Sequence, residues 1–131
     1  MKSINVVAAI IIDGDKVLAT QRADGDFKGG WEFPGGKVEH GESSECALVR
    51  EIKEELNLEI NIDYYLETVK YEYPKFHLSM DCFVCSLVSG DLELVDHMAA
   101  RWLDRKSIDT VEWLPADIGI VEKLKNSVLM D

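Results

Sequence analysis

The chain has 131 residues, 47% of them hydrophobic, and a formal charge of −11 at pH 7. This length is typical of one domain, so we expect a single domain over residues 1–131. The charge argues against nucleic acid as a partner, because binding to a polyanion depends on Lys and Arg side chains that neutralise phosphates. A small phosphorylated substrate stays compatible with this charge if a divalent cation masks its phosphates.

The first part of the chain predicts a β-hairpin followed by a glycine-rich loop. Residues 5–12 are apolar and largely β-branched, residues 13–15 read Asp-Gly-Asp, and residues 16–21 continue as a second strand. Residues 24–30 are polar and rich in glycine, and we expect a mobile loop there. The apolar run 6–12 is far too short to span a bilayer, so we expect no membrane association.

Residues 44–56 predict a helix with two different faces. Ser43 and Ser44 carry side-chain oxygens that can cap its start, and no Gly or Pro interrupts residues 47–56. At about 100° per residue, apolar side chains gather on one side and carboxylates on another. The apolar side holds Leu48, Val49, Ile52 and Leu56, and the acidic side holds Glu51, Glu54 and Glu55.

The second half of the chain predicts more strands and a final helix. Residues 59–62, 64–73 and 76–88 favour strands, residues 92–99 are ambiguous, and residues 100–104 favour a short strand around Trp102. Residues 106–112 favour a brief helix. Pro115 can begin a last helix that runs to about residue 127, with an apolar stripe of Ile118, Val121, Leu124 and Val128. Strands around one central helix, with a second helix at the end, fit a sheet covered on both faces.

The acidic face of the central helix is a candidate metal site. Carboxylates at this spacing repel one another by roughly 0.2–0.5 kcal/mol for each i,i+4 pair, so a cation would compensate them. Hard oxygen ligands suit Mg²⁺ or Mn²⁺. Taken alone, however, three glutamates at this spacing are more typical of a solvated acidic surface.

The residues around this cluster carry a more specific pattern. Gly36, Glu42, Arg50, Glu51, Glu54 and Glu55, with Ile52 and Leu58 at two hydrophobic places, follow the spacing of the Nudix box. The chain therefore resembles a Nudix hydrolase, and its flanking segments WEFPGGKVE, YEYP and LPADIGIVEKL are similar to MutT-type members. One residue departs from the pattern, because Asn57 stands where the family usually has Gly. We expect Asn to be accepted there, since it adopts the left-handed backbone more readily than other residues except Gly.

The resemblance implies a fold, a reaction and a set of roles. The fold is α/β, an α/β/α sandwich with a central mixed sheet and a catalytic loop and helix. Glu51, Glu54 and Glu55, with the carbonyl of Gly35, would bind Mg²⁺, with Mn²⁺ possible, and carry the catalysis. Gly36, Glu42 and Arg50 would support the site, and Asp96 would add a loop carboxylate that binds metal or acts as base, unless it is an ordinary solvated aspartate.

The implied reaction is Mg²⁺-dependent hydrolysis of a nucleoside triphosphate to the monophosphate and diphosphate. CTP, dCTP and modified nucleotides such as 8-oxo-dGTP are the expected substrates of this small-molecule enzyme. Hydrolysis of ADP-ribose or another nucleotide sugar is the alternative within the class. A non-catalytic nucleotide-binding module is a third possibility, which the retention of every motif glutamate disfavours.

Candidate substrate-binding residues lie outside the motif, and each has an ordinary alternative. Arg22 can bind a phosphate or form a surface ion pair. Phe33, Tyr73 and Phe76 can stack on a base or fill the core. Asp117 can accept hydrogen bonds from amino groups of cytosine or guanine, or it can favour the start of the last helix through its charge.

The cysteines and histidines do not point to chemistry. Cys82 and Cys85 lie in a predicted strand, where residues three apart face opposite sides, so we expect core packing rather than a redox or metal motif. An odd number of cysteines forms no disulfide framework, which favours a reducing cytoplasm. The three histidines, His40, His77 and His97, have no recognisable partners, and we expect them on the surface or in loops. The chain would act as a monomer or a homodimer.

Overall fold

The computed structural model describes residues 2–127. Within this range the strands form one seven-stranded sheet in the order β3-β2-β1-β6-β5, while β4 pairs with β1 and β7 pairs with β2. The pairing of β1 with β6 is parallel and the other pairings are antiparallel, so the sheet is mixed, as expected. The strands are β1 (Lys2–Asp13), β2 (Lys16–Arg22), β3 (Trp31–Glu32), β4 (Gly35–Lys37), β5 (Glu59–Tyr73), β6 (Phe76–Ser89) and β7 (His97–Leu103).

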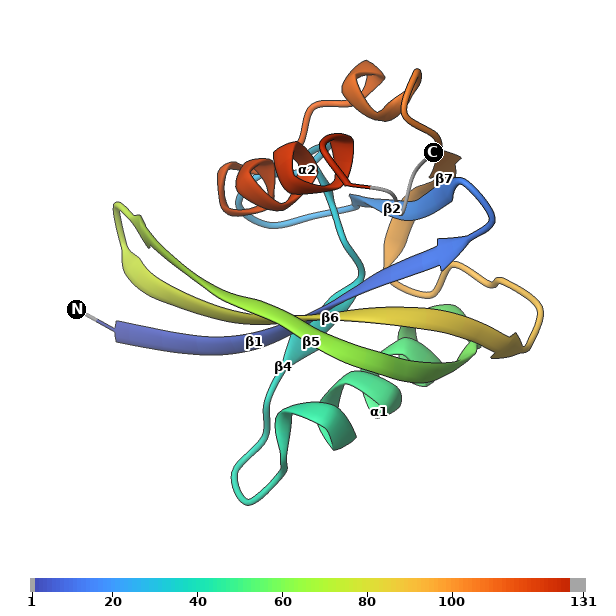
Figure 1. Ribbon diagram of the computed structural model, residues 1–131. Helices are drawn as coiled ribbons and strands as arrows, with labels where there is room; N and C mark the ends of the chain where they lie inside the picture. The colour runs from blue at the N-terminus through green and yellow to red at the C-terminus, as the bar shows by residue number, and fades with distance from the viewer. Residues whose placement is uncertain (1, 128–131) are drawn as a thin grey trace.

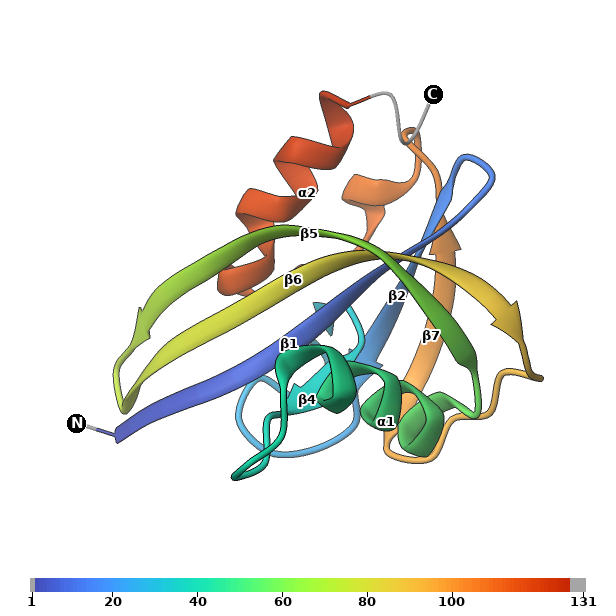
Figure 2. The same cartoon turned by 60° about the horizontal axis from the view of Figure 1, so that its bottom comes forward.

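Helices cover both faces of the sheet. The helix α1 (Ser44–Leu56) lies on one face and α2 (Ile118–Lys125) on the other, with the 3-10 turns η1 (Ile108–Thr110) and η2 (Pro115–Asp117) before α2 (Figures 1 and 2). Each helix packs on its own hydrophobic core, and the two cores are separated by the strands. The expected α/β/α sandwich is therefore confirmed. No helix within residues 2–127 is long and apolar enough to span a membrane.

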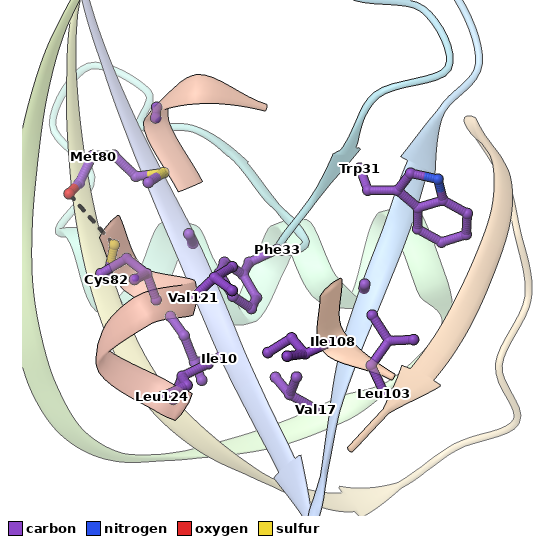
Figure 3. Packing of buried hydrophobic residues seen from close by; sticks show 14 of the residues in the cluster. Ile10, Val17, Trp31, Phe33, Met80, Cys82, Leu103, Ile108, Val121 and Leu124 are labelled. Carbon is purple, nitrogen blue, oxygen red and sulfur yellow. Dashed lines mark hydrogen bonds between the residues drawn. The ribbon is translucent and has the colours of Figure 1, made fainter. Parts of the chain in front are cut away.

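The strand β1 separates the two cores because its side chains alternate between them. Ala8 and Ile10 belong to the core under α2, and Val7, Ala9 and Ile11 belong to the core under α1. In the same way Cys82 packs beneath α2 with Ile10 and Leu124, as Figure 3 shows, while Cys85 packs in the other core. Burial raises the pKa of both thiols to about 12, so the packing interpretation of this pair is confirmed.

The helix α1 begins and ends where its sequence predicts. The hydroxyl of Ser43 accepts a hydrogen bond of 3.1 Å from the backbone N–H of Cys46, and this caps the first turn. Asn57 ends the helix in the left-handed region at φ 57°, and its N–H donates to the carbonyl of Lys53. The expected apolar face was wrong at one position, because Val49 is exposed and Ala47 is buried in its place. Val49 falls on the flank of the stripe that Ala47, Leu48, Ile52 and Leu56 form.

The later elements differ from their predictions in extent. Residues 59–73 form one strand with three register shifts rather than two short strands, because bulges absorb the irregular pattern. β7 begins at His97, three residues before the predicted strand. In the last helix Ile118 is exposed and Ile120 is buried, so the buried stripe is Ile120, Val121 and Leu124. Val128 lies outside the described residues.

Candidate active site

Gly35 and Gly36 allow β4 to lie close to β1 and to the side chain of Glu51 on α1. A Cβ built on Gly35 would lie 1.8 Å from the backbone oxygen of Val7, because β4 pairs with β1 at this point. A Cβ on Gly36 would lie 2.3 Å from the carboxyl group of Glu51. Both positions therefore require glycine. Gly35 lies against the backbone of Val7 in β1, and Gly36 lies against the side chain of Glu51.

Arg50 forms hydrogen bonds with acidic side chains of the loop before α1 and of α1 itself. Its Nε and Nη2 donate to the two carboxylate oxygens of Glu42 at 2.7 and 2.9 Å, which is the bidentate geometry of a strong ion pair. Its Nη1 donates to Glu51 at 2.9 Å and to Glu54 at 3.1 Å. The hydrogen bonds from Arg50, with one from the backbone N–H of Glu39, lower the pKa of Glu42 to about 2. Arg50 on α1 thus holds the carboxylate of Glu42 in the loop before the helix. Their role as support of the site stays a prediction.

A loop brings Asp96 to the end of α1. The N–H of Glu93 donates to the carbonyl of Leu56 at 2.9 Å, and the N–H of Val95 donates to the carbonyl of Glu55 at 3.3 Å. Asp96, the next residue, shares a hydrogen bond with the side chain of Glu55. Burial, followed by Asp96 and the charges of Glu51 and Glu54, raises the pKa of Glu55 to about 7. Glu55 and Asp96 therefore form a carboxyl pair that keeps a proton near neutral pH.

These groups line one acidic cleft. Its walls include Gly35, Gly36, Glu51, Glu55, Asp96 and His97. Glu54 is not among the lining residues, since its side chain is 57% exposed and turned to Arg50, whereas that of Glu51 is only 14% exposed. Glu54 still lies beside Glu51, because Nη1 of Arg50 donates to both carboxylates, at 2.9 Å to Glu51 and at 3.1 Å to Glu54. The joint metal-binding role of the three glutamates stays a prediction.

The donor set of the cleft fits a divalent cation. Among residues 2–127 no three His, Cys, Asp or Glu side chains converge as a ready metal-binding group. The cleft nevertheless concentrates carboxylates, and burial, together with the neighbouring Asp96, Glu51 and Glu54, raises the pKa of Glu55 to about 7. Carboxylate and backbone oxygens are the ligands that Mg²⁺ and Mn²⁺ accept. A cation would relieve the repulsion once the side chains turn toward it.

A second cavity of about 220 Å³ adjoins the cleft. The predicted aromatic residues Phe33, Tyr73 and Phe76 line it, and Tyr73 stacks on Phe76 with 5.0 Å between the ring centroids. Phe33 and Tyr73 are also buried in the core beneath α2, so the core role and a cavity role coexist. The hydroxyl of Tyr73 accepts a hydrogen bond of 3.2 Å from the N–H of Ala116 and so fixes the floor of the cavity to η2.

Asp117 is a buried polar group in the wall of this cavity. It is 3% exposed and accepts a 3.5 Å hydrogen bond from the backbone N–H of Phe33. Burial, and then the charge of Glu32, raises its pKa well above the ordinary value. Its side chain makes no capping hydrogen bond to α2, although it lies at the start of that helix.

Arg22 and Glu32 stand between the two spaces. The guanidinium of Arg22 donates to Glu32 at 2.7 and 3.2 Å, and both residues line the acidic cleft as well as the aromatic cavity. The ion-pair alternative for Arg22 is thus present, although in the site rather than on a remote surface. Glu32 was not predicted, and its only signal was a charged residue between two aromatic residues, Trp31 and Phe33, before the glycine turn.

His97 was also misplaced by the sequence interpretation. Its side chain is only 11% exposed and lines the acidic cleft, with Nε2 3.9 Å from Glu32. Its Nδ1 is buried and has no hydrogen-bond partner among the described residues, and burial lowers its pKa. A polar residue at the first position of a strand, directly after a candidate acidic residue, was the signal available in the sequence.

A mixed sheet between two helices, with an acidic loop and helix beside an aromatic cavity, is the arrangement expected of the Nudix class of hydrolases. The chain belongs to the NUDIX domain family, whose model matches residues 2–125. It is 38% identical over 123 residues to the CTP pyrophosphohydrolase of Escherichia coli strain K12, covering 93% of this chain and 91% of that protein.

Other relatives agree with this assignment. The chain is 33% identical to the 8-oxo-dGTP diphosphatase of Haemophilus influenzae over 129 residues, which cover 95% of this chain and 94% of that protein. The crystal structure of a MutT protein from Methanosarcina mazei Go1 superposes with a TM-score of 0.84 at 25% identity, covering 95% of this chain and 94% of that one. The protein is therefore a Nudix hydrolase, and enzymes of this family generally need a divalent metal.

Proposed function

We propose that this enzyme hydrolyses a nucleoside triphosphate to the monophosphate and diphosphate with Mg²⁺. The observation that carries the proposal is the shared wall of the two spaces. Arg22, Glu32, Gly35 and Gly36 line both the acidic cleft and the aromatic cavity. A ligand with an aromatic base at one end and a metal-bound phosphate chain at the other fits two adjoining spaces of this kind.

The cleft residues would hold the cation. Glu51, Glu55 and the carbonyl of Gly35 are the proposed ligands, and Asp96 is placed to join them from its loop. Glu54 joins them if its carboxylate turns from Arg50 into the cleft. When bound, Mg²⁺, or Mn²⁺ in its place, neutralises phosphate charge and lowers the pKa of a coordinated water.

The protein's own groups prepare the reaction in three ways. Arg50 orients Glu51 through a 2.9 Å hydrogen bond, which keeps its carboxylate facing Gly36. Glu55, whose pKa is about 7 in the metal-free protein, is the proposed group that accepts a proton from an attacking water. Arg22 is placed at the boundary of the cleft, where its guanidinium can exchange part of its pairing with Glu32 for a substrate phosphate.

The base specificity is assigned to Asp117. As a carboxylate it accepts hydrogen bonds from an amino group, such as N4 of cytosine or N2 of guanine. Its raised pKa also lets it carry a proton, and it then donates one hydrogen bond while accepting another. The neighbouring donor and acceptor of cytosine, or of an oxidised purine, match such a group. CTP, dCTP and modified nucleotides such as 8-oxo-dGTP are the proposed substrates.

One substrate screen tests the proposal. Purified protein is incubated with Mg²⁺ and CTP, dCTP, 5-methyl-dCTP, 8-oxo-dGTP or ADP-ribose, and the products are separated by ion-exchange chromatography. We expect monophosphate and diphosphate from at least one triphosphate. Preferential cleavage of ADP-ribose would instead assign the enzyme to nucleotide sugars, and release of orthophosphate alone would contradict the proposed bond cleavage.

A matched pair of variants links the activity to the cleft. Glu55→Gln removes a proposed ligand and proton acceptor, while Glu45→Gln makes the same change at an exposed position on the same helix. We expect the first to abolish turnover while the protein stays folded, and the second to leave turnover unchanged. Equal activities would remove Glu55 from the mechanism.

A further inference from the structure

Phe27 combines two features that cost free energy. Its backbone is in the left-handed region at φ 67°, where bulky side chains are rare. Among the described residues the only other non-glycine there is Asn57, whose conformation is explained by the end of α1. The ring of Phe27 is also 39% exposed. The strained backbone and the exposed ring are both unfavourable. Local backbone preference and core packing therefore do not explain why Phe27 is held in this position.

The loop that carries Phe27 is fixed at its base. The N–H of Arg22 donates to the carbonyl of Gly30 at 2.9 Å, and the N–H of Gly29 donates to the carbonyl of Arg22 at 2.9 Å. The carbonyl of Phe27 accepts from the N–H of Gly30, and the guanidinium of Arg22 donates to the carbonyl of Asp26. The loop is therefore bonded to the end of β2, and its conformation presents the ring of Phe27 outward from this base.

The ring lies at the rim of the aromatic cavity. It contacts the ring of Tyr73, with 5.0 Å between centroids. Phe27 lines the cavity that contains Asp117, and it also lines a shallow outer groove together with Tyr73 and Phe76. Phe27, Tyr73 and Phe76 thus form the wall between the cavity and this groove, and Phe27 is the most exposed of the three.

We propose that Phe27 is a substrate-binding residue that stacks on the nucleobase at the rim of the cavity. This deepens the proposed function and rests on a nucleotide being the ligand. Stacking on an aromatic ring is available to every base, because every base has a π face, so Phe27 contributes affinity while Asp117 reads the base edge. Strained backbone persists where the surrounding structure and the function require it, which explains why the ring is held in a left-handed conformation.

Tyr71 provides a matched control. It is 39% exposed like Phe27, and its ring lies 4.8 Å from that of Tyr73, but it does not line the cavity. The experiment compares Phe27→Leu, Phe27→Asn and Tyr71→Leu with the wild type. The measurements are kcat and KM for a triphosphate, the Kd of CMP and of GMP by calorimetry, inhibition by inorganic pyrophosphate, and the free energy of unfolding.

The expected pattern separates stacking from a structural role. Both Phe27 variants should weaken monophosphate binding and raise KM about tenfold, within the range known for base stacking on aromatic side chains. Inhibition by pyrophosphate, which has no base, should not change. Phe27→Asn should unfold no more easily than the wild type, since Asn tolerates the left-handed backbone. Tyr71→Leu should leave every binding constant unchanged.

Several results would overturn the assignment. Monophosphate binding by Phe27→Leu that equals that of Tyr71→Leu would show that the ring does not touch the base. An equal loss of pyrophosphate inhibition would show that Phe27 only positions the loop and Arg22. If the wild type hydrolysed no triphosphate, the proposed function would fail, and the monophosphate Kd values would still decide the role of Phe27. A wild type that binds neither monophosphate would refute the stacking role as well.

Discussion

Alanine is expected to have different effects at the two glycines of the turn before α1. At Gly36 it should lower activity, and at Gly35 it should lower stability. In Gly36→Ala the new Cβ would lie 2.3 Å from the carboxyl carbon and Oε2 of Glu51, whereas ordinary contacts begin at 3.4 Å. The carboxyl group must therefore move by about 1 Å, and misplacement on this scale costs roughly 100-fold in rate. Because the obstacle is the end of a side chain, we expect kcat to fall about that far while the protein stays folded.

Gly35→Ala meets a different obstacle. Its Cβ would lie 1.8 Å from the backbone oxygen of Val7, in the central strand β1, which cannot turn away. We expect a loss of stability at or above the upper end of the roughly 1–3 kcal/mol that overpacking costs. Gly119→Ala is the control, because a Cβ there meets no atom within 4 Å and its position is helical, so alanine should add about 0.4–1 kcal/mol.

The assay pairs urea unfolding with release of diphosphate, for the three variants and the wild type. Wild-type kcat in Gly36→Ala would refute the reasoning, since it would show that Glu51 needs no fixed position. Wild-type stability in Gly35→Ala would show that β4 and β1 are not as close as the structure places them. A comparable loss of stability in Gly119→Ala would show that alanine itself, and not the contact, is responsible.

Further predictions concern the ionisable groups. In the metal-free protein an NMR titration should give Glu55 a pKa of about 7, and Asp96→Asn should lower it; an unchanged value would separate the two carboxyls. Glu42 has a pKa of about 2 against an ordinary 4.5, so its pair with Arg50 stabilises the fold above pH 4.5 and is lost as pH falls toward 2. Acid unfolding of Glu42→Gln should therefore depend less on pH in this window. The raised pKa of Asp117 has the opposite effect on stability. The unfolded chain loses the proton of Asp117 at lower pH than the folded protein does, so stability falls as pH rises above about 3.9. Asp117→Asn should remove this pH dependence in thermal unfolding.

The catalytic helix could be predicted because its determinants are local. Ser43 and Asn57 act on backbone groups within one turn, and the spacing of Glu51 and Glu55 fixes their directions on the helix. The Gly-Gly turn could be recognised as a motif, but the sequence did not show that one glycine serves β1 and the other serves Glu51. That division depends on the strand pairing of β4, which is a property of the whole sheet.

The loop residues could not be predicted from local patterns. Phe27 and His97 look like ordinary polar-loop or strand-end positions, and their roles arise from contacts with Tyr73 and Glu32, far away in the sequence. The rotamer of Glu54 could not be predicted for a related reason. Helical spacing gives the direction of a side chain from the axis but not its rotamer, and the rotamer is set by its ion pair with Arg50.

The acidic cleft is divided between a rigid helix and a loop, and this division has a cost. Gly90 lets the loop pass the end of α1, because at φ 111° its Cβ would lie 2.4 Å from the carbonyl oxygen of Asn57. The backbone hydrogen bonds beyond it then hold Asp96 beside Glu55, although the two carboxyls repel. A fold selected only for stability would separate such groups. The arrangement opposes folding, and the proposed cation would offset the repulsion, which is the trade between stability and activity expected at a metal site.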